Sequence, residues 1–439
     1  MTKIHFKRVL LIIAMTVILI VPLILSATSF FNPKNIQNED KKMASLTPAG
    51  FLDKELIKEV GDSPWSVDIG DANNDGFDDI ITANTKGNST SILCWNDTAK
   101  DWNEAITKKV GVNPIGVDIG DVNNDTYNDI VTANYEDDNV SILLGKQDGT
   151  WESEFTLEVE NKPRSVAIGD VDNDGDNDIL TANSFSDDLT ILCWNDTAKD
   201  WIAEGPIDVG DNPHDVSIGD ADNDGFNDIV TANYASNDIS ILCWDNDSQD
   251  WDGEKTFDVG SNPYAVDIGD TNHDGRNDII TANLADDSIT IIFGNETNGW
   301  DENTTKNVGE DPRGVKIGDL DNDTYNDVVT ANFQWGKVSI FFWNDTEGEW
   351  NPEIKRNVGS GPYDIDIGDV NNDGINEIVT ANSYTDRVSI LCWGDDSTEP
   401  DGNGNDEINI PGYSLLLIAP ISIISIIVLV YKSKKIRIN

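Results

Sequence analysis

Short β-type segments follow one another between residues 51 and 393, and none of them shows helical periodicity. The first type reads V-x-I-G-D, as at residues 67–71, the second reads D-I-[IVL]-T-A-N, and the third reads S-I-L-C-W or a variant of it. The fourth begins at a Trp and ends eight residues later at a Val, as from Trp102 to Val110. Because each is short, rich in β-branched residues and bounded by Gly, Asn, Asp or Pro, the pattern predicts four strands.

This four-strand unit is repeated seven times at a nearly constant interval. The aspartate that ends the first segment recurs every 49 or 50 residues, at Asp71, Asp121, Asp170, Asp220, Asp270, Asp319 and Asp369. Four strands in a repeat of this length are typical of one propeller blade. The sequence therefore predicts an all-β fold, a seven-bladed β-propeller of four-stranded blades. A stacked solenoid is the rival, but seven copies fit ring closure better.

The two ends of the repeat array predict how the ring closes. The last copy stops after its third segment, at Trp393, and an extra fourth-type segment from Phe51 to Val60 precedes the first copy. We expect this segment to supply the outer strand of the seventh blade, which leaves no open sheet edge. The propeller is predicted to span residues 51–393.

Apolar segments lie at both ends of the chain. A basic start is followed by an apolar run from Val9 to Leu25, and a second run from Ser414 to Val430 is followed by four basic residues. Positive charge beyond both runs predicts that the middle of the chain is extracellular and anchored in the cytoplasmic membrane. We expect residues 1–26 to be a signal peptide or signal-anchor, 27–50 a linker, 394–412 an acidic flexible linker, 413–431 a transmembrane helix and 432–439 a basic cytoplasmic tail.

The composition points to cations. Lys and Arg number 29 against 81 Asp and Glu, a net charge of −52, which argues against nucleic acid as a partner. The chain is nevertheless 38% hydrophobic and has 13 Trp, unlike a disordered acidic tail. Three His make multi-His metal catalysis and Ser-His chemistry poor candidates. The four Cys share one third-segment position that is otherwise apolar, so we expect free, buried thiols.

Every repeat carries D-x-[ND]-x-D-[GT]-x-x-[DE] between its first two segments. Oxygen ligands at positions 1, 3, 5 and 9, with the position-7 carbonyl, suit Ca²⁺ better than the strictly octahedral Mg²⁺. The predicted ligands are Asp71, Asn73, Asp75 and Asp79; Asp121, Asn123, Asp125 and Asp129; Asp170, Asp172, Asp174 and Asp178; Asp220, Asp222, Asp224 and Asp228; Asp270, Asn272, Asp274 and Asp278; Asp319, Asp321, Asp323 and Asp327; Asp369, Asn371, Asp373 and Glu377. We predict up to seven structural Ca²⁺ ions.

Two features qualify the metal loops. They are not EF-hands, because Thr82 and Thr132 stand where a bidentate Glu would be required. The position-6 Gly, which permits a left-handed turn, is replaced by Thr126 and Thr324 in loops two and six, so these two loops depart from the pattern. One such loop would be read as an ordinary Asp/Asn/Gly-rich turn. Seven with the same acidic spacing favour metal binding.

The repeats resemble the FG-GAP/VCBS family, whose best-known members are the seven-bladed propellers of integrin α subunits. The resemblance covers about residues 51–393 and rests on the Asp loops, the [VE]-[GE]-x-x-P run and the I-G-D run. It implies a β-propeller with Ca²⁺ sites in hairpins and extracellular recognition, without naming a ligand. Some relatives of this repeat class bind carbohydrate or are polysaccharide lyases. The ending from Pro411 to Tyr413 with its apolar span also resembles archaeal surface-protein sorting signals, which usually read Pro-Gly-Phe.

A variable position marks a candidate ligand-binding face. The residue after the repeat Pro is Trp65, Ile115, Arg164, His214, Tyr264, Arg313 or Tyr363, and these seven are expected to ring the mouth of the central channel. Tyr135, Tyr234, Phe333 and Trp335 join the same face. Recognition and plain loop packing between blades both remain open here. Lys316 is the only cation at its position inside the V-x-I-G-D runs, and we interpret it as half of a structural ion pair.

Three functions compete. The chain is interpreted as a membrane-anchored, Ca²⁺-stabilised recognition or adhesion module at the cell surface, which binds a glycan or a surface protein. The alternatives are an extracellular polysaccharide-degrading, lyase-like enzyme and a structural component of the cell envelope. No catalytic cluster is visible and His214 looks isolated, so we do not expect an enzyme. Ten N-x-[ST] sequons, at Asn88, Asn96, Asn124, Asn139, Asn195, Asn246, Asn295, Asn303, Asn322 and Asn344, predict a glycoprotein.

Overall fold

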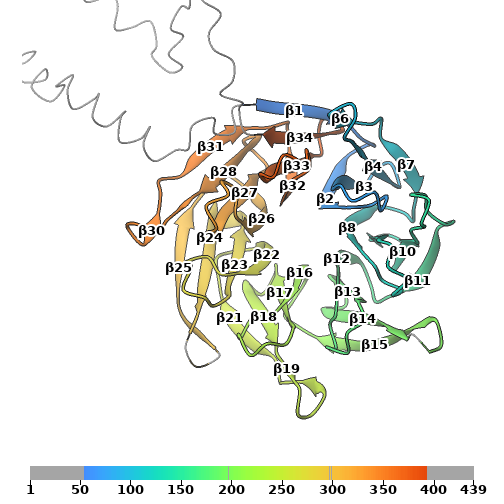
Figure 1. Ribbon diagram of the computed structural model, residues 1–439. Coiled ribbons are helices and arrows are strands. Elements are labelled where there is room, and N and C mark those ends of the chain that lie inside the picture. The colour runs from blue at the N-terminus through green and yellow to red at the C-terminus, as the bar shows by residue number, and fades with distance from the viewer. Residues whose placement is uncertain (1–53, 196, 296, 298, 393–439) are drawn as a thin grey trace, which may run out of the picture. The chain divides into compact units, whose positions relative to one another are not determined.

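A computed structural model describes residues 54–392 except 196, 296 and 298 (Figure 1). These residues form seven four-stranded antiparallel sheets arranged around a central opening, which confirms the predicted seven-bladed β-propeller. No helix in these ranges is long and apolar enough to cross a membrane. The expected signal or anchor segment, transmembrane helix, linkers and basic tail all lie outside the described residues and stay predictions.

The V-x-I-G-D and T-A-N segments form the two inner strands of every blade. The first strands, around the opening, are β2 (Pro64–Gly70), β8 (Pro114–Gly120), β12 (Pro163–Gly169), β16 (Pro213–Gly219), β22 (Pro263–Gly269), β26 (Pro312–Gly318) and β32 (Pro362–Gly368). The second strands are β3 (Asp79–Asn84), β9 (Asp129–Asn134), β13 (Asp178–Asn183), β17 (Asp228–Asn233), β23 (Asp278–Asn283), β27 (Asp327–Asn332) and β33 (Glu377–Asn382). Every residue of the second strands is buried, because a blade is covered on both faces by its neighbours.

The outer half of each blade is less regular. The third strands are β4 (Ser89–Leu93), β10 (Asn139–Leu143), β14 (Asp188–Asn195), β18 (Asp238–Leu242), β24 (Ser288–Gly294), β28 (Lys337–Phe341) and β34 (Arg387–Cys392). The fourth strands are β7 (Ile106–Lys109), β11 (Phe155–Glu158), β15 (Asp200–Asp208), β21 (Lys255–Asp258), β25 (Trp300–Asn307), β31 (Ile354–Asn357) and β1 (Lys54–Glu59).

The prediction that each fourth strand begins at its Trp is wrong in four blades. In blades one, four and six the Trp belongs to a separate two-stranded ribbon, β5–β6 (Trp95–Asn96 with Asp101–Trp102), β19–β20 (Trp244–Asp245 with Asp250–Trp251) or β29–β30 (Trp343–Asn344 with Glu349–Trp350). In blade two Trp151 forms an isolated bridge to Gly145. In all four blades, pairing with the third strand resumes four residues after the Trp, at Ile106, Phe155, Lys255 and Ile354.

The ring is closed by a strand from the start of the propeller. β1 pairs antiparallel with β34, from Lys54 opposite Cys392 to Glu59 opposite Arg387, and so completes the seventh blade (Figure 1). The predicted clasp is therefore confirmed. It joins the first and last blades and leaves no open edge between them.

Apolar side chains fill the spaces between blades. Seven clusters of buried residues each combine two neighbouring sheets; one joins Ile81 and Ile92 of blade one to Ile130 and Trp151 of blade two. The four thiols, Cys94, Cys193, Cys243 and Cys392, are buried and free, as expected. The Trp pairs on the outer side likewise pack edge to face, with ring centroids 4.6–5.1 Å apart.

The repeated T-A-N triplet forms a buried polar network that ties each blade to the incoming chain. In blade one the Thr82 hydroxyl donates to Asn84 Oδ1, Asn84 Nδ2 donates to Ser91 Oγ, and the same Ser91 Oγ accepts from the Gly61 N–H. A Cβ on Gly61 would lie 2.6 Å from the Asn84 side chain, so only Gly fits there. Because every buried polar atom of this network has a partner, the triplet can lie in the core.

The strand order defines two faces. The loops between first and second strands and between third and fourth strands lie on one side, named here the metal-loop face. The loops between second and third strands, and those that enter the first strands, lie on the other, named the channel-mouth face. Strand β34 runs toward the metal-loop face and β1 starts there, so Lys54 and Cys392 both lie at that face.

Candidate metal loops and a channel-mouth pocket

All seven metal loops adopt one conformation. The residue at position 4 has a left-handed backbone in each, and so does the residue at position 6. The first aspartate holds this turn, since one of its carboxylate oxygens accepts the position-6 N–H at 2.7–3.1 Å in every loop. The fifth side chain in turn accepts the position-7 N–H. Asp, Asn and Gly suit this turn because they satisfy its hydrogen bonds and left-handed positions locally.

The two loops without a position-6 Gly keep this shape. Thr126 and Thr324 have φ angles of 75° and 76°, in the left-handed region that β-branched residues avoid. Their N–H groups donate to Asp121 and Asp319 at 2.7 and 2.8 Å, as Gly does elsewhere. Thr therefore does not abolish the loop geometry, but it makes these two loops strained.

The carboxylate at position 9 is buried at the root of each loop. Asp79 is fully buried, and its oxygens accept N–H groups of Trp95 and Asn73. Burial raises the pKa of Asp79 to about 7 and that of Glu377 to about 9, and the neighbouring loop carboxylates add to the effect. Burial away from water and repulsion between neighbouring carboxylates both destabilise the charged forms of these acids, unless a bound cation offsets the negative charge.

The arrangement fits a bound cation. In three loops the side-chain oxygens of different acids lie within 4.8 Å of one another, in the groups Asp170, Asp172 and Asp174; Asp220, Asp222 and Asp224; Asp319, Asp321 and Asp327. Several loop oxygens are also buried with no hydrogen-bond partner among the described residues, namely Asn123 Oδ1, Asp170 Oδ1, Asp321 Oδ1 and Glu377 Oε2. Orphaned buried oxygens facing other acids are what a hard cation would satisfy.

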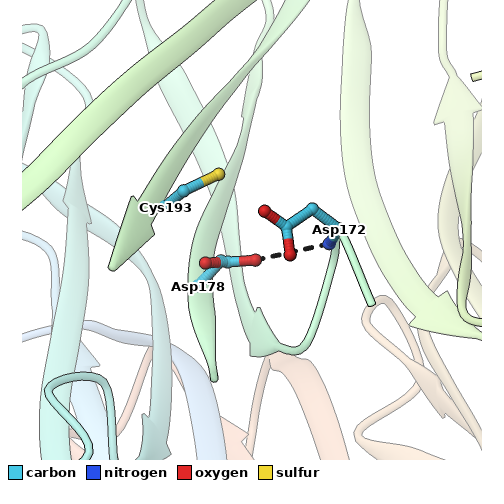
Figure 2. A group of neighbouring side chains, drawn as sticks. All are labelled: Asp172, Asp178 and Cys193. Carbon is cyan, nitrogen blue, oxygen red and sulfur yellow. Dashed lines mark hydrogen bonds between the residues drawn. The ribbon is translucent and has the colours of Figure 1, made fainter. Parts of the chain in front are cut away.

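A thiol lies behind some of these loops. Figure 2 shows Cys193 beside Asp172 and Asp178, with the Asp172 N–H donating to Asp178 Oδ2 at 3.4 Å. Cys243 lies in the same way near Asp222 and Asp228. Burial, followed by the adjacent carboxylates, raises the pKa of Cys193 well above its ordinary value, so the sulfur stays protonated. The ligand atoms of Cys193, Asp172 and Asp178 lie within 4.8 Å of one another, so the thiol is close to the predicted oxygen donors.

Neighbouring metal loops are linked around the ring. The Asn at position 8 donates its amide to the carbonyl of the first aspartate in the preceding blade, as Asn128 does to Asp71 at 3.0 Å. Blades two to seven all make this contact. Blade one has Asp78 at this position, which has no N–H to donate. Burial raises the pKa of Asp78, and Asp369 of blade seven is the next largest cause. The metal-loop ring therefore has a seam between the last blade and the first.

On the other face, the seven variable residues predicted to ring the channel mouth line a single depression of about 60 Å³, which we name the mouth pocket. Trp65, Ile115, Arg164, His214, Tyr264, Arg313 and Tyr363 all border it. Each comes from a different blade, since each follows the Pro that begins a first strand.

These side chains pack tightly on one another. Trp65 stacks on Tyr363 with ring centroids 4.4 Å apart, and Tyr264 meets Tyr363 edge to face, hydroxyl to hydroxyl. Arg164 Nη2 donates to the Tyr264 hydroxyl at 2.5 Å. The Arg313 guanidinium lies over Tyr363 at 4.6 Å and is held by Asp311 through two bonds of 3.2 Å. The mouth pocket is thus bordered by a lattice of aromatic rings and guanidinium groups.

The expectation that His214 is isolated is wrong. Its ring stacks on Tyr234 at 4.2 Å and meets Tyr264 edge to face at 4.7 Å, inside the mouth pocket. Burial, followed by the charges of Arg164 and Arg313, lowers the pKa of His214 to about 2. The imidazole is therefore neutral at any physiological pH. The residues around His214 are far apart in the sequence, and only the closed ring of blades brings them together. The contacts of His214 could therefore not be seen in the sequence.

Below the mouth pocket lies a polar cavity of about 280 Å³. Its walls carry the carboxylates of Asp68, Asp118, Asp215, Asp267 and Asp364, and Lys316. Most of these acids bridge blades: Asp68 Oδ2, for example, accepts the Ile119 N–H at 2.9 Å.

Among the described residues that line this cavity, Lys316 is the single basic one. Its Nζ lies 3.9 Å from Asp366 in the adjacent blade, as the structural ion-pair interpretation requires. Although burial opposes its charge, the carboxylates of Asp366, Asp267 and Asp68 raise the pKa of Lys316. Lys316 thus offsets part of the acidity of the channel.

Sequence reasoning missed four residues of this region. Asp215 and Asp364 border the mouth pocket from the position after the variable one, where other blades have Ser, Gly or Ala. Phe185 and Tyr384 are 78% and 66% exposed, two residues after their T-A-N triplets. The aromatic residues found directly after other triplets were the available signal.

Comparison with known proteins supports the repeat assignment. Residues 121–181 and 319–380 match the model of the FG-GAP-like repeat family. No curated protein matches the chain. Among solved structures, BBS1N in complex with ARL6DN has a TM-score of 0.56 at 10% identity, over 78% of this chain and 97% of that one.

Two further structures show the same architecture. Hydrazine synthase of Kuenenia stuttgartiensis has a TM-score of 0.55 at 15% identity, over 77% of this chain and 98% of that one. A putative 6-phosphogluconolactonase of Bacteroides fragilis has a TM-score of 0.53 at 16% identity, over 78% and 92%. At such identities the similarity extends to the fold alone.

Proposed function

Because the chain carries FG-GAP-like repeats on a closed seven-bladed β-propeller, we propose that it is a membrane-anchored recognition module of the cell surface. Its ligand is a glycan or a surface protein, and it binds at the channel-mouth face. Ca²⁺ ions in the metal loops stabilise the ring.

One observation carries the proposal: large aromatic side chains are exposed on the channel-mouth face. Phe185, Trp335 and Tyr384 are 78%, 40% and 66% exposed. Tyr384 packs edge to face on Phe333, which contacts Tyr363 of the pocket, so the Tyr384 ring continues the buried lattice outward. Exposed aromatic groups beside cationic ones are typical of binding surfaces, whereas isolated ones are not.

The path of the chain supports this orientation. Lys54 and Cys392, where the propeller begins and ends, both lie at the metal-loop face. If the flanking segments anchor the protein in a membrane, as the sequence predicts, the channel-mouth face is the one free of these connections. A ligand could therefore approach the mouth pocket without meeting either linker.

Ca²⁺ is the cation that best suits the metal loops, because each loop offers several oxygen donors and Ca²⁺ accepts variable coordination geometry, whereas Mg²⁺ requires an octahedron. A bound ion would supply positive charge to carboxylates that otherwise repel one another. Asp71, Asn73, Asp75 and Asp79 would hold it in the first loop, and the equivalent residues in the others. Its role is structural, since the loops lie on the face opposite the mouth pocket.

The test is retention of the full chain, solubilised in mild detergent, on cell-envelope material in Ca²⁺. A variant with Phe185→Ser, Trp335→Ser and Tyr384→Ser should lose retention. The matched control replaces three exposed isoleucines of the outer strands, Ile57→Ser, Ile106→Ser and Ile202→Ser, and should be retained. Protease treatment of the envelope distinguishes a protein ligand, whose removal abolishes retention, from a glycan. A folded chain that is not retained, or variants that behave alike, would refute the proposal.

Enzymatic activity is the second candidate, and the grouping in the mouth pocket is what favours it. His214, Tyr264 and Arg164 are titratable or charged groups that converge at one depression. Burial raises the pKa of Tyr264, so its hydroxyl stays protonated and a tyrosinate base is hardly populated, and the pocket is small. Incubation of envelope polysaccharide with the chain, followed by ultraviolet detection of unsaturated uronate ends, would reveal a lyase.

A further inference from the structure

We infer that the mouth pocket binds the carboxylate of an acidic sugar through the guanidinium of Arg164. This inference rests on the proposed recognition function and names the class of ligand, a glycan that contains uronic or other carboxylated residues. The argument starts from the charge of Arg164 and then considers its surroundings.

Among the described residues, no carboxylate oxygen lies within 4.0 Å of a guanidinium nitrogen of Arg164. Its Nη2 donates hydrogen bonds to the hydroxyls of Tyr264 and Tyr363, at 2.5 and 3.4 Å. The neighbouring Arg313 differs, because Asp311 accepts two bonds from it. A guanidinium has five N–H donors in a planar fork, so most of those of Arg164 remain available.

Two acids border the same pocket, but their oxygens are already engaged. Asp215 accepts from the Ser165 hydroxyl at 2.7 Å and from the Val266 N–H at 3.0 Å. Asp364 accepts from Ser66 Oγ at 2.9 Å and from two backbone N–H groups. These acids join neighbouring blades. The Arg164 fork is therefore the part of the pocket that still requires an anionic partner.

The surroundings of Arg164 favour a sugar acid over a free anion. Flat aromatic surfaces border the pocket, with Trp65 and Tyr363 on one side and His214 with Tyr264 on another. A sugar ring presents an apolar C–H face next to its carboxylate, which suits an aromatic wall beside a guanidinium. A depression of about 60 Å³ has room for the carboxylate and part of one ring, while the rest of the glycan would lie over the exposed Phe185 and Tyr384.

The net charge of −52 opposes an acidic glycan at long range. This repulsion is screened beyond about 8 Å at physiological ionic strength, whereas the contact with Arg164 is local and partly buried. Retention should therefore persist, or strengthen, when salt is raised from low to physiological concentration. A surface held together by diffuse charge attraction would show the opposite dependence.

The test compares two forms of one probe, envelope polysaccharide whose carboxylates have been reduced to alcohols and the same polysaccharide after mock treatment. The full chain in detergent and Ca²⁺ should be retained on the mock-treated form and lose at least tenfold in affinity on the reduced form. Retention on both forms would overturn the carboxylate inference and leave the proposed recognition function standing. Retention on neither would overturn both for a glycan ligand.

Variants assign the effect to the pocket. Arg164→Gln should weaken binding to the mock-treated form by about tenfold to a hundredfold, the range for loss of a charge-assisted bidentate pair. Arg164→Lys keeps the charge but loses the fork and should also bind weakly. The control, Lys146→Gln, removes one positive charge from the metal-loop face and should bind like the parent chain. Equal binding by Arg164→Gln and Lys146→Gln, with unchanged melting temperatures, would overturn the inference.

Discussion

Replacement of the strained threonines by glycine should stabilise the propeller. Thr126 and Thr324 hold φ angles of 75° and 76° in loops two and six, where the other five loops have Gly. Both side chains are exposed, so their removal sacrifices little packing. The substitutions Thr126→Gly and Thr324→Gly therefore act mainly on the backbone.

The expected magnitude follows from two opposing terms. A non-Gly residue in the left-handed region costs roughly 1–2 kcal/mol, and Gly relieves this cost. Gly also loses about 0.5–1 kcal/mol more than other residues through the entropy of the unfolded chain. Each substitution should therefore raise the free energy of unfolding by about 0.5–1 kcal/mol. The two effects should add, because the loops lie in different, non-adjacent blades.

The reciprocal change provides the control. Gly76 in loop one has a φ angle of 90°, and a Cβ added there would meet nothing within 4 Å. Gly76→Thr therefore introduces the strain without a clash, and it should destabilise the chain by about the amount that Thr126→Gly stabilises it.

The assay is thermal unfolding of the full chain in detergent, in chelator and again in Ca²⁺, with a shift of about 1 °C for each substitution. Both threonines complete N-x-T sequons with Asn124 and Asn322, so the proteins should be made in a host without N-glycosylation. A lower melting temperature for Thr126→Gly together with a higher one for Gly76→Thr would refute the reasoning. If only the values in Ca²⁺ shifted, the substitutions would be acting on metal affinity rather than on strain.

Three further predictions concern the whole ring. Chelation should lower the melting temperature, because a cation that binds only the folded loops stabilises them by mass action; an unchanged melting temperature would argue against structural Ca²⁺. Asp78→Asn should stabilise the ring by about 1 kcal/mol, because an amide could donate to the Asp369 carbonyl across the seam; Asp78→Ala, which removes the charge without adding the donor, is the comparison. Burial raises the pKa of Asp364 to about 6 and of Asp366 to about 7, from 3.8, so the folded state binds these protons more tightly. Stability in chelator should therefore fall as pH rises from about 4 to about 7, a slope that denaturant unfolding at several pH values would detect.

Most of the fold could be predicted because it is repeated. Seven copies of the same segments fix the number of blades, the strand order and the clasp, so errors in one copy are corrected by the others. The position-6 threonines were the exception, since sequence alone could not show that Thr126 would adopt the Gly conformation. The fourth strands were misplaced because Trp102 and its equivalents are apolar at the boundary of a strand, and their side chains pack between blades from outside the ladder.

The candidate site was predicted in outline only. Repeat symmetry places the seven variable residues at one mouth, as the structure bears out. It cannot show which rings stack or that His214 lies against Tyr264, because these contacts join different blades and depend on side-chain conformation. Asp215 and Asp364 escaped attention because their position is occupied by small residues elsewhere. The metal ligands were identified by type and spacing, while the identity of the cation remains a prediction.

The pairing of β1 with β34 also determines how the ring would respond to force. The two strands are antiparallel, and the ends at which the chain enters and leaves, Lys54 and Cys392, face each other at the same end of the pair. A force that separates these two ends would break the hydrogen bonds between β1 and β34 one after another, starting at Lys54 and Cys392. It would not load all of them at once in shear. Such a geometry yields at low tension, so a propeller tethered at both ends would lose its seventh outer strand first, while the other six blades stay folded.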